Sequence, residues 1–179
     1  LYGECDAEVL APRPRPLSAP TASDAKTARE MIERAERPVV ISGGRLHGEA
    51  ALGALTAFSE RFEVPVSPAH RRLHTFDSQH PHCAGRLPNR APAEQMELLR
   101  QSDLVIVLGE RLGPSVSQGY TFPRAPDPDQ PLIHVWPDPD EVGRIWRPTL
   151  GLACDPHEFL KMMLDAPPAS IPSGRGEWI

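Results

Sequence analysis

The sequence of 179 residues has no hydrophobic run that approaches the roughly 20 residues of a transmembrane helix. It also has no stripe of basic residues, and its net charge is −5, so neither a membrane nor a nucleic acid is an expected partner. Cysteine is scarce: Cys5, Cys83 and Cys154 lie far apart and form no CxxC motif. An odd number of separated cysteines argues against a disulfide framework and favours the reducing cytoplasm.

The sequence also lacks the common catalytic signatures. Neither a GxSxG elbow nor an HExxH motif occurs, so no residue is assigned as catalytic. Zinc needs three or four ligands, and residues 70–83 do concentrate suitable ones: His70, His74, His80, His82 and Cys83. Pro68 and the polar run after it favour a loop, in which these side chains need not converge. Exposed loop histidines are therefore preferred over a metal site.

Proline, by contrast, is abundant, with 22 residues. Proline-rich stretches at 12–20 and 167–172 have the composition of stiff linkers. We therefore expect residues 1–21 to be a linker from a preceding domain and residues 22–166 to be the folded domain. Residues 167–179 are then the linker toward a further C-terminal domain.

Short apolar runs alternate with segments of helical periodicity. The runs are rich in β-branched residues and predict buried strands at 39–42, 64–67, 103–109, 131–136 and 150–154. Helices are predicted after Ser23 as N-cap, over 48–62, over 91–103 and over 155–166. This order predicts an α/β fold, a Rossmann-like doubly wound parallel sheet with helices on both faces.

One capping device occurs twice. The stretches DPDE at 138–141 and DPHE at 155–158 each place Asp at the N-cap, Pro at the first helical position and Glu two residues later. Each stretch is therefore predicted to open a helix directly after a strand.

The stretch SGGRLHGEA at 42–50 follows a predicted strand and precedes a predicted helix. Glycine allows a tight turn and close approach of a phosphate to the backbone. The spacing, however, is Gly43-Gly44-x-x-x-Gly48 and not GxGxxG. Turn geometry alone is the preferred interpretation, with a nucleotide contact as the alternative.

In a doubly wound sheet, ligands bind beyond the carboxyl ends of the strands. Arg111 lies there, where it is suited either to a phosphate or to a neighbouring carboxylate. Asp138 is suited to a ribose, although its capping role already accounts for it. Trp136 is either an edge of the core or a stacking platform.

Taken together, several segments resemble one family, the central domain of thiamine diphosphate-dependent enzymes such as acetolactate synthase and benzoylformate decarboxylase. The resemblance covers about residues 22–165, and its most specific segments are DLVIVLGERL and IHVWPDPDEVGR. It implies a DHS-like NAD/FAD-binding topology and a parent chain with two further domains, N-terminal and C-terminal, which bind thiamine diphosphate and Mg²⁺. The family's GDG…N metal motif is absent here, so the chain by itself is expected to be a non-catalytic scaffold of a homo-oligomeric lyase or transferase.

The resemblance also implies a ligand site. Some relatives hold FAD or ADP in this domain, and the corresponding positions here are Gly43, Gly44, Gly109, Arg111 and Asp138. The sequence departs from the flavin-binding pattern in three ways. Arg45 replaces a third glycine, bulky cations occupy the loop AHRRLHTF, and Trp136 replaces an aspartate. We therefore expect a vestigial site, with FAD or ADP as the less favoured occupants.

Two other functional classes stay open on the sequence alone. One is an NAD- or nucleotide-binding domain of a deacetylase-like or electron-transfer flavoprotein-like protein, which has a similar topology. The other is a free-standing nucleotide-sensing module.

Overall fold

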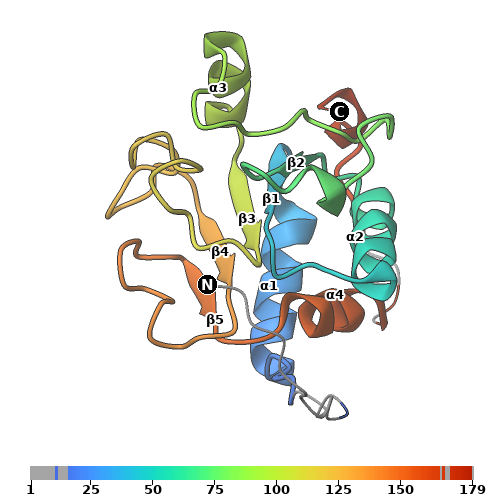
Figure 1. The fold of residues 1–179 in the computed structure, drawn as a ribbon. Coiled ribbons are helices and arrows are strands. Elements are labelled where there is room, and N and C mark those ends of the chain that lie inside the picture. The colour runs from blue at the N-terminus through green and yellow to red at the C-terminus, as the bar shows by residue number, and fades with distance from the viewer. Residues whose placement is uncertain (1–10, 12–15, 166, 168–169, 179) are drawn as a thin grey trace, which may run out of the picture.

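The computed structural model describes residue 11, residues 16–165, residue 167 and residues 170–178 (Figure 1). Most of the predicted N-terminal linker, and Cys5 with it, therefore lies outside the described residues. Five strands form one parallel sheet in the order β2-β1-β3-β4-β5. Their bounds are β1 Pro38–Ser42, β2 Val66–Pro68, β3 Leu104–Leu108, β4 Leu132–Val135 and β5 Leu150–Leu152.

Helices cover both faces of the sheet, which confirms the predicted fold class. One face packs against α1 (Ala22–Arg34), α2 (Glu49–Phe62) and α4 (Pro156–Asp165). The other face packs against α3 (Ala93–Arg100) and against the loop that follows β3. Two short 3₁₀ helices, η1 (Leu73–Thr75) and η2 (Arg175–Glu177), complete the described structure. Every helix in the described part of the chain is too short or too polar to cross a bilayer.

Alternation along the strands divides their side chains between two cores. In β3, Ile106 packs with the helices α1, α2 and α4, whereas its neighbours Val105 and Val107 belong to the core under α3. Burial on both faces explains why the strands read as continuous apolar runs.

Two predicted helix starts are wrong, and one is confirmed. Thr21, not Ser23, caps α1, because its Oγ1 accepts the amide hydrogen of Asp24 at 3.1 Å. Asp155 caps α4 as predicted, accepting from the amide of His157 at 2.9 Å. After Asp138, however, the chain forms only turns, so β4 and β5 are joined without a helix.

The C-terminal segment carries a buried cation. The Arg175 guanidinium is fully buried and donates to carbonyls at the ends of two helices: Phe62 of α2 at 2.8 Å and Ile32 of α1 at 2.7 Å. It also donates to the carbonyl of Ala35, just past α1. Trp178 Nε1 donates to the carbonyl of Pro38 at 2.8 Å. Part of the predicted C-terminal linker is thus hydrogen-bonded to the sheet and to two helices.

Candidate functional site

The carboxyl ends of β1 and β3 meet through their glycine turns. The Gly43 amide donates to Leu108 O at 2.9 Å, and the Arg45 amide donates to Gly109 O at 3.1 Å. A Cβ atom on Gly43 would lie only 2.3 Å from Gly109 O, and Gly109 has a φ of +67°. Both glycines are therefore required by the turn itself, whether or not a ligand binds.

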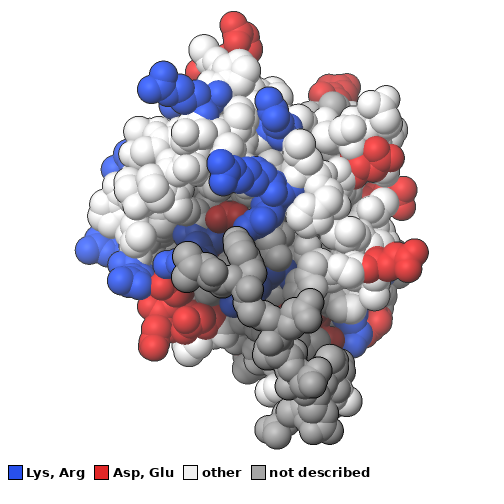
Figure 2. Space-filling model, in the orientation of Figure 1, with Lys and Arg blue, Asp and Glu red and all other residues white. Residues whose placement is uncertain are grey.

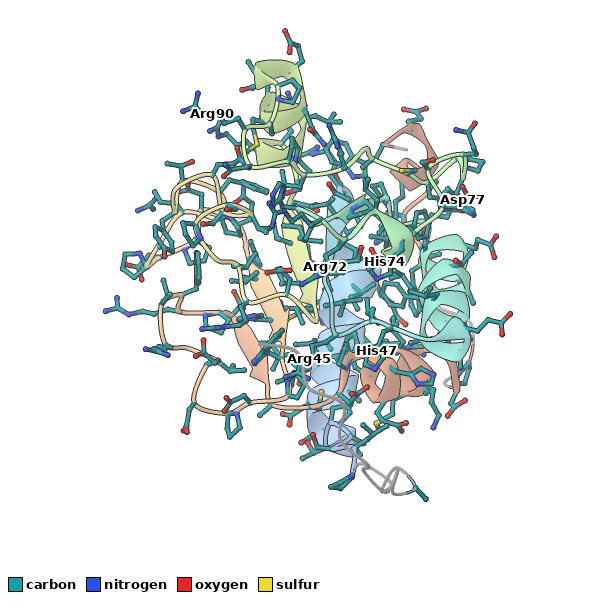
Figure 3. All side chains as sticks on the ribbon, in the orientation of Figure 1. Arg45, His47, Arg72, His74, Asp77 and Arg90 are labelled. Atoms are coloured by element: carbon teal, nitrogen blue, oxygen red, sulfur yellow. The ribbon has the colours of Figure 1, made fainter. Side chains whose placement is uncertain are left out.

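Two arginine side chains lie over these glycines (Figure 3). A Cβ on Gly44 would lie 2.4 Å from Arg72 Nε, and a Cβ on Gly109 would lie 2.7 Å from Arg45 Cβ. The Arg45 guanidinium stacks over the Trp136 ring, 5.1 Å from its centroid. Trp136 thus serves as a stacking platform, and the group on it is the chain's own arginine.

Glu110 lies beside this arginine pair. Burial raises the pKa of its carboxyl, while the Arg111 amide at 3.1 Å and the nearby Arg72 guanidinium act in the opposite direction. His134 lies beneath it, with Nε2 2.9 Å from the Glu110 carbonyl, and burial lowers the pKa of that imidazole. At pH 7 the site therefore combines a neutral, buried histidine with several arginines.

The two other predicted contacts are engaged within the chain. Arg111 Nη2 lies 2.9 Å from Glu141 Oε2, so its guanidinium pairs with a neighbouring carboxylate. Asp138 Oδ1 accepts the amide hydrogen of Asp140 at 3.0 Å and so stabilises a turn. Glu141 links the two residues, because its own amide donates to Asp138 O at 3.2 Å.

The structure therefore brings Gly43, Gly44 and Gly109 together at one edge of the sheet and joins Arg111 to Asp138 through Glu141. Sequence reasoning did not identify Arg72 and Glu110 as parts of this edge. The run of cations in AHRRLHTF was a signal for Arg72, since it replaces the glycine-rich loop of flavin binders. No comparable signal marked Glu110.

The histidine-rich stretch makes local contacts. His82 Nδ1 lies 3.0 Å from Ser59 Oγ, and His80 Nε2 lies 3.3 Å from Glu60 Oε1. The two imidazole rings pack edge to face, with centroids 5.1 Å apart. Within the described residues, no group of three or more His, Cys, Asp or Glu side chains could hold a metal ion.

Comparisons with known proteins agree on one family. Residues 25–163 match the family model described as "Thiamine pyrophosphate enzyme, central domain". A sulfoacetaldehyde acetyltransferase of Rhodobacter capsulatus is 34% identical over 143 residues, which are 79% of this chain and 24% of the relative. An acetolactate synthase large subunit of Corynebacterium glutamicum is 31% identical over 157 residues, 87% of this chain and 24% of the relative. The chain thus spans about a quarter of the length of these curated relatives.

Solved structures show the same fold. Benzoylformate decarboxylase from Polynucleobacter necessarius superimposes with a TM-score of 0.65 at 20% identity, covering 96% of this chain and 32% of that one. The parallel sheet, the glycine turns at its carboxyl edge and the match over residues 25–163 lead to one conclusion. This chain belongs to the family of thiamine pyrophosphate enzyme central domains.

Proposed function

We propose that this chain is the scaffold domain of a thiamine diphosphate-dependent enzyme that decarboxylates or joins 2-keto acids. In this proposal it connects an N-terminal and a C-terminal domain of the same parent chain, and those domains bind the cofactor. The family match carries the proposal, and the acetyltransferase and synthase among the relatives support it. The match favours this reading over the deacetylase-like and flavoprotein-like alternative.

Thiamine diphosphate, held with Mg²⁺, supplies a carbanion that attacks and stabilises keto carbons. Carboxylate oxygens are the ligands that Mg²⁺ requires, and no cluster of them in the described part of the chain could hold a metal ion. The residues of this chain therefore do not fit the cofactor's metal, and catalysis is assigned to the other domains.

The test is turnover of a 2-keto acid by the purified chain with added thiamine diphosphate and Mg²⁺. We expect none, whereas the full-length parent should release CO₂ or form a carboligation product. Decarboxylation by the 179-residue chain alone would contradict the scaffold role.

We further propose that the strand-end site is vestigial. A dinucleotide bound in this fold places its diphosphate over the glycine turns. Here that space is taken by Arg72 over Gly44 and by Arg45 over Gly109, and Arg45 also covers the Trp136 ring. The residues present therefore do not fit FAD or ADP in the usual position.

Flavin retention tests the vestigial site. The chain is incubated with FAD, with inorganic pyrophosphate in excess to suppress binding through charge alone, and is then desalted. We expect no absorbance near 450 nm for the natural sequence and retained flavin for Arg45→Gly, which restores a glycine to the turn. Arg144→Gly, in an exposed turn, is the matched control. Flavin retained by the natural sequence would show a working site.

A homo-oligomeric parent in the cytoplasm completes the proposal. The scarce, separated cysteines support the compartment. Light scattering on the purified full-length parent tests the assembly, and a monomer would contradict it.

A further inference from the structure

Two adjoining hollows lie away from the glycine turns, between the loop after β2 and α3. One has a volume of about 380 Å³ and is lined by His70, Arg71, Arg86 and Arg90, among others. The other, of about 640 Å³, runs along the start of α3 and includes Glu94 and Gln95. Arg86, Pro88 and Arg90 line both hollows, so the two form one continuous depression.

The arginines of this depression have no acidic partner. Among the residues that the structure describes, no carboxylate lies within ion-pair distance of Arg71, Arg86 or Arg90. Exposed arginines elsewhere are paired, as Arg124 is with Asp129 and Arg147 with Asp127. Figure 2 shows basic side chains over the upper and central part of this face, with most acidic ones along its margins. Unpaired positive charge is therefore concentrated here on a chain whose net charge is −5.

Backbone contacts hold the segment that carries Arg86 and Arg90. The Leu87 amide donates to Pro68 O at 2.8 Å, which fixes the segment to the end of β2. Gln95 Nε2 donates to Arg86 O at 2.8 Å, and Gln118 Nε2 donates to Pro88 O at 2.7 Å. The two arginines are thus mounted on a braced loop and not on a free one.

Arg71 is held in an uncommon conformation. Its φ is +60°, in the left-handed region that costs a residue with a side chain about 1 kcal/mol or more. Such backbone strain is consistent with a position where the direction of the side chain matters.

We propose that this depression binds a small molecule carrying a diphosphate or two nearby phosphates. Guanidinium groups donate paired hydrogen bonds to phosphate oxygens, and three of them surround a space of the size that small ligands occupy. A nucleic acid would need a longer basic stripe than the sequence contains. Figure 3 shows Arg90 beside α3 and Arg72 near the centre of the molecule, so this site is separate from the glycine turns.

Isothermal titration of the 179-residue chain with inorganic pyrophosphate tests the proposal. We expect binding that weakens as NaCl is raised, a loss of at least tenfold in R86Q/R90Q, and no change in R124Q/R147Q. The last variant removes two equally exposed but paired arginines and so controls for net charge. Thermal melts of all variants verify that each is folded.

Three results would overturn the proposal. The first is no binding of pyrophosphate to the natural sequence. The second is an equal loss in R86Q/R90Q and R124Q/R147Q, which would indicate nonspecific attraction. The third is tighter binding of a hexaglutamate peptide than of pyrophosphate, which would assign the depression to an acidic protein segment. The scaffold role stands or falls independently, because it is tested by turnover.

Discussion

At the end of β3, Glu110 is a carboxyl whose surroundings favour its neutral form. Burial raises its pKa above 4.5 despite the opposing Arg72 and Arg111. A raised pKa means that the folded state holds the proton more tightly than the unfolded state, so stability from this group is lost as pH rises above about 4.5. We therefore expect Glu110→Gln to raise the melting temperature at pH 7 more than at pH 4. Glu97→Gln, exposed on α3, is the control, and an equal shift at both pH values would contradict the sign.

Cys154 is a thiol that the fold makes unreactive. Burial raises its pKa to about 12, and the carboxylates of Asp155 and Asp24 add to the shift. Since the thiolate is the nucleophile, we expect Cys154 to resist iodoacetamide at pH 8 in the native protein and to react once urea unfolds it. Peptide mass spectrometry reports the labelling, with the half-buried Cys83 as the internal comparison. Rapid native labelling of Cys154 would contradict the expectation.

At the scale of elements, packing decides which capping signals become helices. After Asp155, the residues Phe159, Leu160 and Met163 form a buried stripe, so α4 follows its cap. After Asp138, the next turn contains Asp140 and exposed basic residues, and the same signal closes only a turn. The local pattern was thus identical, and the difference was the apolar face that pays the entropy of helix formation.

The glycine turns were predictable for a similar reason, and the rest of the site was not. Gly43 and Gly109 follow strands that neighbour each other, so their meeting follows from the strand prediction. Arg72 reaches Gly44 from a separate loop after β2, and Arg45 meets Trp136 from the far side of β3. Such contacts depend on side-chain reach across the sheet, which spacing along the chain does not encode.

Gly43 joins two elements, and its substitution tests that junction. A Cβ there would lie 2.3 Å from the backbone oxygen of Gly109, which cannot move without shifting the end of β3. We expect Gly43→Ala to destabilise the fold by about 2 kcal/mol or more, measured by urea unfolding. The matched control is Gly53→Ala in α2, where nothing lies within 4 Å and a gain of about 0.5–1 kcal/mol is expected. Equal effects of the two substitutions would contradict the close approach.

At the scale of the whole molecule, the sheet order and both covered faces followed from the alternation of apolar runs and helical periods. The connections did not, because the sequence predicted a helix between β4 and β5 where the structure has turns. Between β3 and β4 the chain covers the sheet with a proline-rich loop whose Phe122 is fully buried. A loop without periodicity can still bury a large side chain, and no periodic signal announces it.

Arg175 connects distant parts of the molecule, and its loss should be felt globally. Its guanidinium serves carbonyls at the ends of α1 and α2, where a cation is also favoured by the helix dipoles. We expect Arg175→Ala to lower the free energy of unfolding by about 3 kcal/mol, because several buried carbonyls lose their donor. Arg34→Ala, in the exposed last turn of α1, should change it by about 0.5 kcal/mol or less. Similar losses in chemical denaturation would contradict the role of Arg175.

The same anchor has a mechanical consequence. Arg175 grips two helices, and Trp178, three residues later, grips the first residue of a central strand. A pull on this segment is therefore delivered to helices and sheet at once, and nothing in it has the slack of a tether. Tension that reaches Trp178 would turn the domain as a rigid lever before it stretched the segment.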